Sequence, residues 1–537
     1  MYDVVIVGYG PVSQALAIML GRQGRSVAIV ERWQERYPLP RAVCIDHEMF
    51  RMLSDIGLRD KLPAVSHPAP PYRWFNAQWK ELLSIDWSAE SISGGTEVNF
   101  IHQPTLEAMF DVAVSEQQTV DVNLGWEATE VGQDDDSAYL VARDMQTGES
   151  RTWRGRYLVG ADGANSLTRR SIGSAQEDRG FQADWLVIDI LPNPGVTLDI
   201  PPAAQYCNPE RPTTIVPAGV RDGQYFRRWE FMRLPHESVQ DIENEATAWA
   251  LLKPWVTPDQ AQMVRHKVYT FRSLIASKWR ERRLLIAGDA AHVMPPFMGQ
   301  GMCAGLRDGW NLAWKLDLIL DGKSDDRLLD TYQEERRPHA SDIIDLSMYL
   351  GKVICIPDKE EAARRDAAFF DRSAPPPPPF PSLTDGVLRK DADGALEPLA
   401  GKLSPHGMVR RLGHVGRFDD LVGLGWVLLT SVRDPLRALS PEQHEVAASL
   451  GLRTVWIDAE GSDQAAGAIV DVDGKYADFL KTHALAAILI RPDFYIYGTA
   501  SEPAGIGALI EDLTNDLRRR GVMVRQAGSA HPLHMAG

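Results

Sequence analysis

One stretch, residues 284–316, constrains this chain most, because it places glycines, an aspartate and two prolines between an apolar strand and a long amphipathic helix. The run at 284–287 is short enough for a buried strand, and Asp289 follows at its carboxyl end, where it suits a ligand hydroxyl. The first turn of the helix offers unpaired N–H groups and a partial positive charge, so we expect it to hold an electron-rich group. The residues assigned to this ligand are Gly288, Asp289, Pro296, Gly299, Gln300, Gly301 and Met302.

A second turn of this kind lies near the N-terminus. A β-branched strand at 3–7 leads into Gly8-x-Gly10, then a helix to about residue 23 and a strand ending in Glu31. In such a βαβ unit Gly8 permits the tight turn, Gly10 lets the backbone approach a pyrophosphate, and Glu31 can accept from a ribose hydroxyl. Ser13 replaces the usual third glycine, which weakens the signal without removing it. The candidate contacts are Gly8, Gly10, Pro11, Val12, Ser13, Glu31 and Arg32.

Three further positions are candidates for the same ligand. An apolar strand near 157–160 delivers Asp162 and Gly163 to its carboxyl end, where open parallel sheets bind ligands. Arg41 follows a proline and could lie along a planar ring or a pyrophosphate, although a solvated loop arginine is the alternative. Gln103 stands at a predicted helix start, where it could bond a cofactor or simply belong to a helix cap.

Together these motifs resemble those of the class A, single-component FAD-dependent aromatic monooxygenases. Gly8-x-Gly10 resembles their ADP-binding fingerprint, Asp162-Gly163 their shared FAD and NAD(P)H motif, and Gly288-Asp289 their ribityl-binding motif. The 3-(3-hydroxyphenyl)propionate hydroxylase and phenol hydroxylase branch is most similar, through HQP at 102, YLVGADGANS from 157, AGDAAHVMPPFMGQG from 287 and YQEERRPHA from 332. The resemblance extends over essentially the whole chain.

The resemblance implies non-covalent, tightly bound FAD, a transient NADH or NADPH donor, and dioxygen as co-substrate. It implies hydroxylation through a flavin C4a-hydroperoxide of a 3-(3-hydroxyphenyl)propionate-like acid, or of a simple or polycyclic phenol. Asp46 matches an active-site aspartate of related phenol hydroxylases and is the first candidate for proton acceptor, with His47 second. A helix-start carboxylate and a surface histidine are the alternatives. Pro296 would offer its carbonyl to the oxygen donor or the substrate hydroxyl.

The resemblance and the hydrophobic pattern predict an α/β chain. A Rossmann-like FAD-binding domain at 1–174 and 281–373 would carry an inserted, mostly antiparallel substrate domain at 175–280. A proline-rich linker at 374–389 precedes a thioredoxin-like α/β domain at 390–537, which lacks CxxC. Pro338 is expected to break the helix that starts near residue 328. The aromatic residues expected to line the substrate pocket, each alone more often core, are Trp185, Tyr225, Tyr269 and Phe271.

Composition limits the partners of the protein. A net charge of -16 over 537 residues argues against a nucleic-acid partner. The sequence contains no run of about 18 apolar residues, so we expect no membrane-spanning helix. The four cysteines are widely spaced, which predicts neither a metal site nor disulfides and favours a reducing, cytoplasmic location. We expect a small aromatic substrate as the partner, and a homodimer stays open. The rival from another class is a binding or regulatory flavoprotein with structural FAD.

Overall fold

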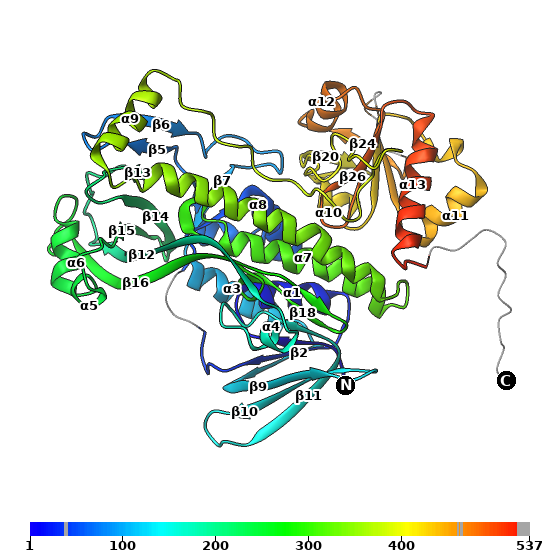
Figure 1. Cartoon of the computed structure of the whole chain (residues 1–537). Helices are drawn as coiled ribbons and strands as arrows, with labels where there is room; N and C mark the ends of the chain where they lie inside the picture. The colour runs from blue at the N-terminus through cyan, green and yellow to red at the C-terminus, as the bar shows by residue number, and fades with distance from the viewer. Residues whose placement is uncertain (37–40, 459–460, 462–464, 524–537) are drawn as a thin grey trace. The chain divides into compact units, whose positions relative to one another are not determined.

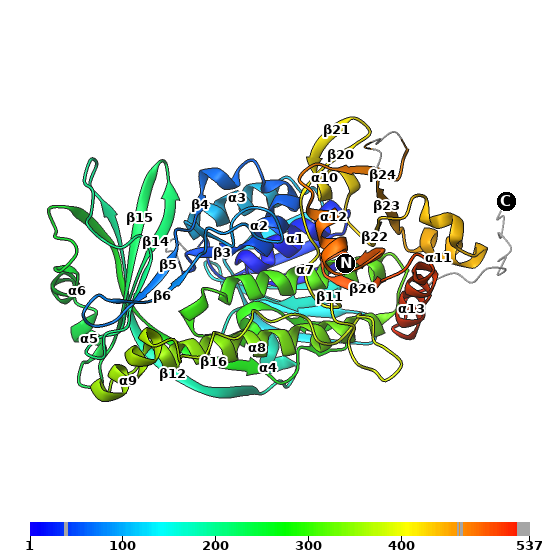
Figure 2. The same cartoon turned by 90° about the horizontal axis from the view of Figure 1, so that it is seen from above.

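The computed structural model describes residues 1–36, 41–458, 461 and 465–523. Its contacts divide the chain into two compact units (Figures 1 and 2). The first unit comprises Met1–Ser91, Gly95–Trp310 and Ala340–Pro381, and the second comprises Ile92–Gly94, Asn311–His339 and the chain from Ser382 on. In the described chain, no helix is both long enough and apolar enough to cross a membrane.

The first sheet of the first unit has a parallel core that carries the N-terminal βαβ motif. Most of its strands contain buried apolar runs, as parallel strands covered on both faces require, whereas the edge strand Val120–Leu124 is largely exposed. The parallel strands, in spatial order, are β18 (Leu284–Ile286), β11 (Ser150–Gly160), β1 (Tyr2–Val7), β2 (Val27–Glu31) and β8 (Val120–Leu124). Antiparallel additions are β17 (Arg280–Glu281), β9 (Trp126–Gln133) and β10 (Ala138–Asp144).

Helices and a small sheet complete this part of the fold. In helix α1, proline at the first position suits the helix start, where its missing N–H costs nothing. The helices are α1 (Pro11–Arg22), α2 (His47–Leu53), α3 (Gln103–Ser115), α4 (Leu167–Ser171), α7 (Gly301–Leu320), α8 (Asp330–Ile354) and α9 (Lys359–Phe370). The part of α7 from Asn311 on and the part of α8 up to His339 belong to the second unit. A three-stranded sheet consists of β3 (Cys44–Asp46), β7 (Val98–Ile101) and β4 (Ser66–Pro68).

The second sheet of the first unit is mostly antiparallel, as expected for the inserted region. Its spatial order is β19 (His292–Val293), β16 (Ala261–Ala276), β12 (Gln176–Pro192), β15 (Gln224–Met232), β14 (Thr213–Arg221), β13 (Ala204–Tyr206), β5 (Tyr72–Phe75) and β6 (Glu81–Ile85). Strands β5, β6 and β19 come from outside residues 175–280, so the sheet is not built by the insertion alone. Helices α5 (Val239–Ile242) and α6 (Glu245–Leu252) follow β15.

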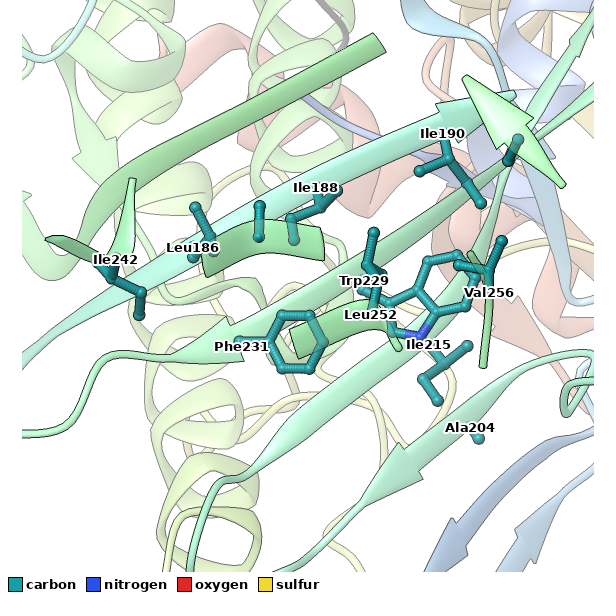
Figure 3. Packing of buried hydrophobic residues seen from close by; sticks show 12 residues of the cluster. Leu186, Ile188, Ile190, Ala204, Ile215, Trp229, Phe231, Ile242, Leu252 and Val256 are labelled. Atoms are coloured by element: carbon teal, nitrogen blue, oxygen red, sulfur yellow. The ribbon is translucent and has the colours of Figure 1, made fainter. Parts of the chain in front are cut away.

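One face of this sheet forms a hydrophobic core (Figure 3). Trp229 and Phe231 alternate along β15 with side chains of the opposite face, and they pack with Leu252 of α6 and with Val256. Trp229 is therefore a core residue. Because this face is filled, polar residues at the alternate positions of the same strands point to the other side of the sheet.

The second unit is an α/β domain with a seven-stranded mixed sheet. The order is β21 (His414–Arg417), β20 (Met408–Arg411), β24 (Ala468–Asp471), β23 (Arg453–Ile457), β22 (Val427–Thr430), β25 (Ala487–Ile490) and β26 (Ile496–Ala500). Its helices include α10 (Phe418–Val422), α11 (Pro441–Ser449), α12 (Lys475–Thr482) and α13 (Gly505–Arg519). The α/β prediction is confirmed, and its likeness to thioredoxin stays a prediction.

Buried ion pairs explain why residues 311–339 belong to the second unit. Glu335 accepts from Lys315 at 2.8 Å and from Arg491 at 2.7 Å, and Arg491 also pairs with Asp493 at 2.8 Å. All four side chains are buried. Burial outweighs the neighbouring carboxylates for the Lys315 ammonium and lowers its pKa to about 8. Removing one partner would leave a buried charge uncompensated.

The prediction that Pro338 breaks a helix was wrong. Helix α8 continues through Pro338, and the division between the two units falls just after it, between His339 and Ala340. A proline removes one backbone hydrogen bond, but Tyr332, Ala340 and Ile343 are fully buried on both sides of it. Packing of these flanking residues therefore outweighs the local cost.

Candidate active site

Three turns meet at one edge of the parallel sheet. Strands β1, β11 and β18 are adjacent, and their last residues are in register, with Val7 opposite Gly160 and Gly160 opposite Ile286. The turns that begin at Gly8, Ala161 and Gly288 therefore leave the sheet side by side. Gly8 has φ +98°, and a Cβ there would lie 2.5 Å from the carbonyl oxygen of Ala161. Only glycine allows these two turns to approach so closely.

A close crossing fixes the start of α7 beside α1. A Cβ on Gly305 would lie 2.7 Å from Cγ2 of Val12 and 3.1 Å from Cα of Gly288. Behind this crossing the buried carboxylate of Asp308 accepts from the Gly288 N–H at 2.9 Å and lies 2.7 Å from Nε2 of His292. Gly305 and Asp308 were not predicted as site residues. Both are buried on α7, the helix whose first turn was predicted to contact the ligand.

The turns open into a cavity of about 330 Å³. It extends from the parallel sheet edge to the inner face of the antiparallel sheet. The structure brings together many of the residues assigned from sequence. Those that line the cavity are Gly10, Pro11, Val12, Ser13, Arg41, Gln103, Gly163, Gly288, Asp289, Pro296, Gly299, Gly301 and Met302.

The cavity end beside α1 fits a dinucleotide. A Cβ on Gly10 would meet no atom within 4 Å, so the backbone is open to a ligand there. Helix α1 has no side-chain cap, which leaves its first N–H groups available for an anion. The buried hydroxyl of Ser13 has no hydrogen-bond partner in the described part of the chain. An FAD pyrophosphate placed here would satisfy these donors.

Five of the residues assigned to the cofactor do not line the cavity: Gly8, which packs closely against Ala161, and four others near these turns. Glu31 accepts from the N–H groups of Tyr9 and Trp33, both at 2.9 Å, so it shapes the first turn. Arg32 lies over the ring of Trp33, with its guanidinium carbon 4.9 Å from the ring centroid. Asp162 accepts from the Ser166 hydroxyl at 2.5 Å and from the Thr168 N–H at 3.1 Å. The fourth, Gln300, accepts from Arg307 at 3.0 Å.

Gln103 positions the loop that carries Arg41. Its side-chain oxygen accepts from the N–H groups of Arg41 at 2.9 Å and of Ala42 at 2.5 Å. Its amide nitrogen donates to Glu107 at 2.5 Å. Gln103 is therefore more than part of a helix cap, since it fixes residues 41 and 42 on the cavity wall.

Asp46 and His47 lie outside the cavity lining found among the described residues. Asp46 caps α2 by accepting from the Met49 N–H at 3.0 Å, and its second oxygen accepts from Arg307 at 2.5 Å. Burial alone would raise the pKa of Asp46, but Arg307, His47 and the Met49 amide together lower it. The structure therefore gives Asp46 the alternative role, a helix-start carboxylate. The imidazole of His47 lies 3.5 Å from Glu97.

Two of the four predicted substrate residues line the cavity. Tyr269 and Phe271 do so from β16. Trp185 is only 1% exposed and packs edge-on against Phe297, with ring centroids 5.8 Å apart. Tyr225 is 59% exposed. Neither residue is among the described lining residues, so the expectation that both contact substrate stays a prediction that the cavity does not support.

A charged group on the antiparallel sheet was missed. Arg228 is 2% exposed and pairs with Asp189 through two nitrogens, at 2.7 and 3.1 Å. Arg265 lies 2.6 Å from the same aspartate. Arg228, Arg265 and Glu230 line the cavity. The sequence contains one signal for this group, the alternation of side chains along a strand. Arg228 and Glu230 stand on either side of the core residue Trp229, so both face the side of the sheet opposite to the core.

Comparisons with known proteins agree with this geometry. A family described as FAD binding domain matches residues 1–347, and one described as HcaD C-terminal domain matches residues 401–516. A probable NADH-specific resorcinol 4-hydroxylase from Rhodococcus jostii (strain RHA1) is 35% identical over 515 residues, which cover 95% of this chain and 94% of that protein.

Two further relatives extend the likeness. A 3-(3-hydroxy-phenyl)propionate/3-hydroxycinnamic acid hydroxylase from Escherichia coli (strain K12) is 29% identical over 535 residues, covering 96% of this chain and 94% of that protein. The crystal structure of the flavin-dependent monooxygenase PieE with FAD and substrate has the same fold, with a TM-score of 0.78, 23% identity, and coverage of 96% of this chain and 99% of that one. The chain therefore belongs to the FAD binding domain family and is an FAD-dependent aromatic monooxygenase.

Proposed function

We propose that this protein hydroxylates a single-ring phenol, using NADH as the electron donor. The observation that carries the proposal is the shared cavity, in which the three flavin-binding turns meet Tyr269 and Phe271 of the antiparallel sheet. Such a cavity would hold the flavin ring and the substrate ring against each other. FAD, once bound and reduced by the nicotinamide, supplies the activated oxygen atom for the ring.

The residues of the chain bind and orient both partners. Gly10 and the start of α1 would hold the pyrophosphate, and Asp289 would accept from a ribityl hydroxyl. The first turn of α7, at Gly301 and Met302, would favour negative charge at the edge of the flavin ring. The carbonyl of Pro296 already accepts from the Gly299 N–H at 2.8 Å and keeps one lone pair for a second donor.

Apolar residues exclude water from the reacting atoms. Phe271, Val187 and Met294 line the cavity beside the charged residues of the sheet. A dry cavity protects the oxygen donor from water and strengthens hydrogen bonds to the substrate. The names of two relatives, a resorcinol hydroxylase and a hydroxyphenylpropionate hydroxylase, support a single-ring phenol over a polycyclic one.

Two single-ring compounds are suggested by the relatives, and the chemistry of each is different. Resorcinol is uncharged, whereas 3-(3-hydroxyphenyl)propionate carries a carboxylate. Identity of 35% to the probable resorcinol hydroxylase and of 29% to the propionate hydroxylase supports a phenol without selecting between them. A homodimer and a cytoplasmic location stay predictions.

Oxygen-isotope labelling tests the function. The purified protein is mixed with NADH and each phenol under labelled dioxygen, and the product is analysed by mass spectrometry. We expect faster NADH oxidation with one phenol and one labelled oxygen atom in its product. A protein that retains FAD but is not reduced by NADH in the presence of any phenol would instead fit the binding or regulatory alternative.

A further inference from the structure

The antiparallel sheet presents a polar group to the substrate end of the cavity. Asp189 on β12 is opposite Arg228 on β15 and Arg265 on β16. Glu230 follows two residues after Arg228 on the same face, and Tyr269 follows four residues after Arg265. Four of these residues, all except Asp189, line the cavity. Three adjacent strands thus build one polar wall.

Both arginines of this wall pair with Asp189. Arg228 donates twice to Asp189, and its remaining terminal nitrogen donates to the carbonyl of Arg41 at 2.6 Å. Arg265 lies 2.6 Å from Asp189 through Nη2 and donates to the Tyr269 hydroxyl at 3.0 Å through Nη1. Asp189 is fully buried between them. These contacts fix the two guanidinium groups.

Glu230 is the group left available to a ligand. Its nearest cation is Nη1 of Arg228 at 3.7 Å, beyond hydrogen-bond distance, and no residue described by the structure donates a hydrogen bond to its carboxylate. Tyr269 already accepts from Arg265, so its own proton can be donated to a ligand. The wall therefore offers the Glu230 carboxylate as an acceptor and the Tyr269 hydroxyl as a donor. A phenolic hydroxyl is a group that can use both.

We propose that Glu230 accepts the proton of the substrate hydroxyl and, by its charge, selects uncharged phenols. The proposal rests on the proposed function. In this step the phenol O–H bond breaks, the proton passes to a Glu230 oxygen, and the electron pair stays on the phenol oxygen. Tyr269 donates to that oxygen. The resulting phenolate is richer in electrons at the ring carbon that takes the oxygen atom.

The environment of Glu230 suits a proton acceptor. Burial, with Asp189 adding to it, raises the pKa of Glu230 although Arg228 and Arg265 oppose the shift. A phenol has a pKa of about 10, so a carboxyl group with a raised pKa is a better match for its proton than an ordinary one. The charged or titratable groups that act on Glu230 or line the same cavity are Arg41, Cys44, Tyr72, Asp189, Arg228, Arg265, Tyr269 and Asp289.

The same charge discriminates between substrates. Asp189 and Glu230 together balance the charges of Arg228 and Arg265, so a substrate carboxylate placed beside Glu230 would meet a like charge. Two like charges about 5 Å apart near a protein surface repel by an amount that corresponds to on the order of a hundredfold in affinity. An uncharged dihydroxybenzene such as resorcinol avoids this repulsion.

The test compares wild type with Glu230→Gln and with the control Glu237→Gln. Glu237 pairs with Arg211, and it is absent from the described cavity lining. Dissociation constants for resorcinol and 3-(3-hydroxyphenyl)propionate are measured on the FAD-loaded proteins without NADH, by perturbation of flavin absorbance. We expect wild type and the control to bind resorcinol at least about tenfold more tightly than 3-(3-hydroxyphenyl)propionate. In Glu230→Gln the difference between the two dissociation constants should be smaller.

Turnover supplies a second readout. Glu230→Gln should keep FAD and its reduction by NADH but lower resorcinol hydroxylation by about 10²- to 10⁴-fold. In wild type kcat/KM should rise with pH as Glu230 loses its proton. This rise of kcat/KM with pH should be absent in Glu230→Gln. If Glu230→Gln fails to retain FAD, Tyr269→Phe replaces it, with weaker resorcinol binding expected.

Several results would overturn the inference without affecting the proposed function. They are a wild-type preference for the phenolic acid, unaltered resorcinol hydroxylation in Glu230→Gln, and unchanged resorcinol binding in Tyr269→Phe. Failure of every phenol to stimulate NADH oxidation would instead remove the proposed function itself. The two failures are therefore distinguishable.

Discussion

Replacing Asp46 by asparagine separates a chemical role from a structural one. In the structure Asp46 caps α2 and pairs with Arg307, which also contacts Glu48 at 2.6 Å and Gln300 at 3.0 Å. This network links the start of α2 to the first turns of α7, beside the predicted flavin site. Asparagine is a good helix cap, so Asp46→Asn keeps the cap but places an amide NH₂, which cannot accept from Arg307, where the second carboxylate oxygen was.

The expected cost follows from the contacts that remain. Loss of a hydrogen bond to a charged group costs about 1.5–3 kcal/mol, and Arg307 keeps two of its partners. Asp46→Ala also loses the cap, which adds about 1 kcal/mol. For a unit of this size, Asp46→Asn should lower the temperature of FAD release by roughly 2–5 °C, and Asp46→Ala by more.

The stability difference depends on pH with a definite sign. Because the folded-state pKa of Asp46 is lowered, its contribution is present above the ordinary carboxyl value of about 3.9 and is lost as the pH falls below it. The gap between wild type and Asp46→Asn should therefore close in acid, from about pH 4 downward.

The assay combines flavin fluorescence on heating with turnover per bound FAD. A structural role for Asp46 predicts a lower release temperature with turnover per flavin within about threefold of wild type. If Asp46→Asn keeps its wild-type release temperature and FAD content yet loses more than about a hundredfold in turnover, Asp46 is the proton acceptor and its assignment to a structural role is refuted.

Three other predictions concern Gly8, Phe271 and Glu335. Gly8→Ala should abolish FAD binding, because its Cβ would lie 2.5 Å from the Ala161 carbonyl oxygen at a φ of +98°; retention of bound FAD would contradict this. Phe271→Ala should raise KM for the phenol about tenfold or more, whereas Tyr225→Ala, at an exposed position, should leave it unchanged in the same assay. Glu335→Gln should lower the free energy of unfolding by about 3–5 kcal/mol in denaturant titrations, since it removes the shared anion of Lys315 and Arg491; unaltered stability would count against this.

The flavin edge of the sheet could be predicted because its signals are local. Each apolar strand is followed within a few residues by the glycine or aspartate that its turn requires, as at Gly8, Gly163 and Gly288. Parallel strands carry such turns to one edge, so the sequence alone is enough to assign three separate segments to one ligand. The helix starts at Pro11 and Gly301 could be predicted for the same reason, because their signals are local.

The substrate end could not be predicted, because it depends on partners far apart in the chain. Asp46 is 261 positions from Arg307, and Arg228 is 39 positions from Asp189. A sequence shows that such residues are charged but not which of them pair. Tyr225 illustrates the same limit for aromatic residues, since only the register of β15 decides whether a side chain faces the cavity or solvent.

The central claim is that the turns around α1 form a cradle for one FAD, and Gly10 tests it most directly. Gly10 has a φ of −83°, which any residue adopts, and a Cβ there meets no protein atom. Gly10→Val should therefore fold normally but fill the space of the pyrophosphate. In calorimetric titration of the apoprotein with FAD, we predict one equivalent bound by wild type and at least about a hundredfold weaker binding by Gly10→Val. Equal binding by both proteins, or none by wild type, would contradict the claim.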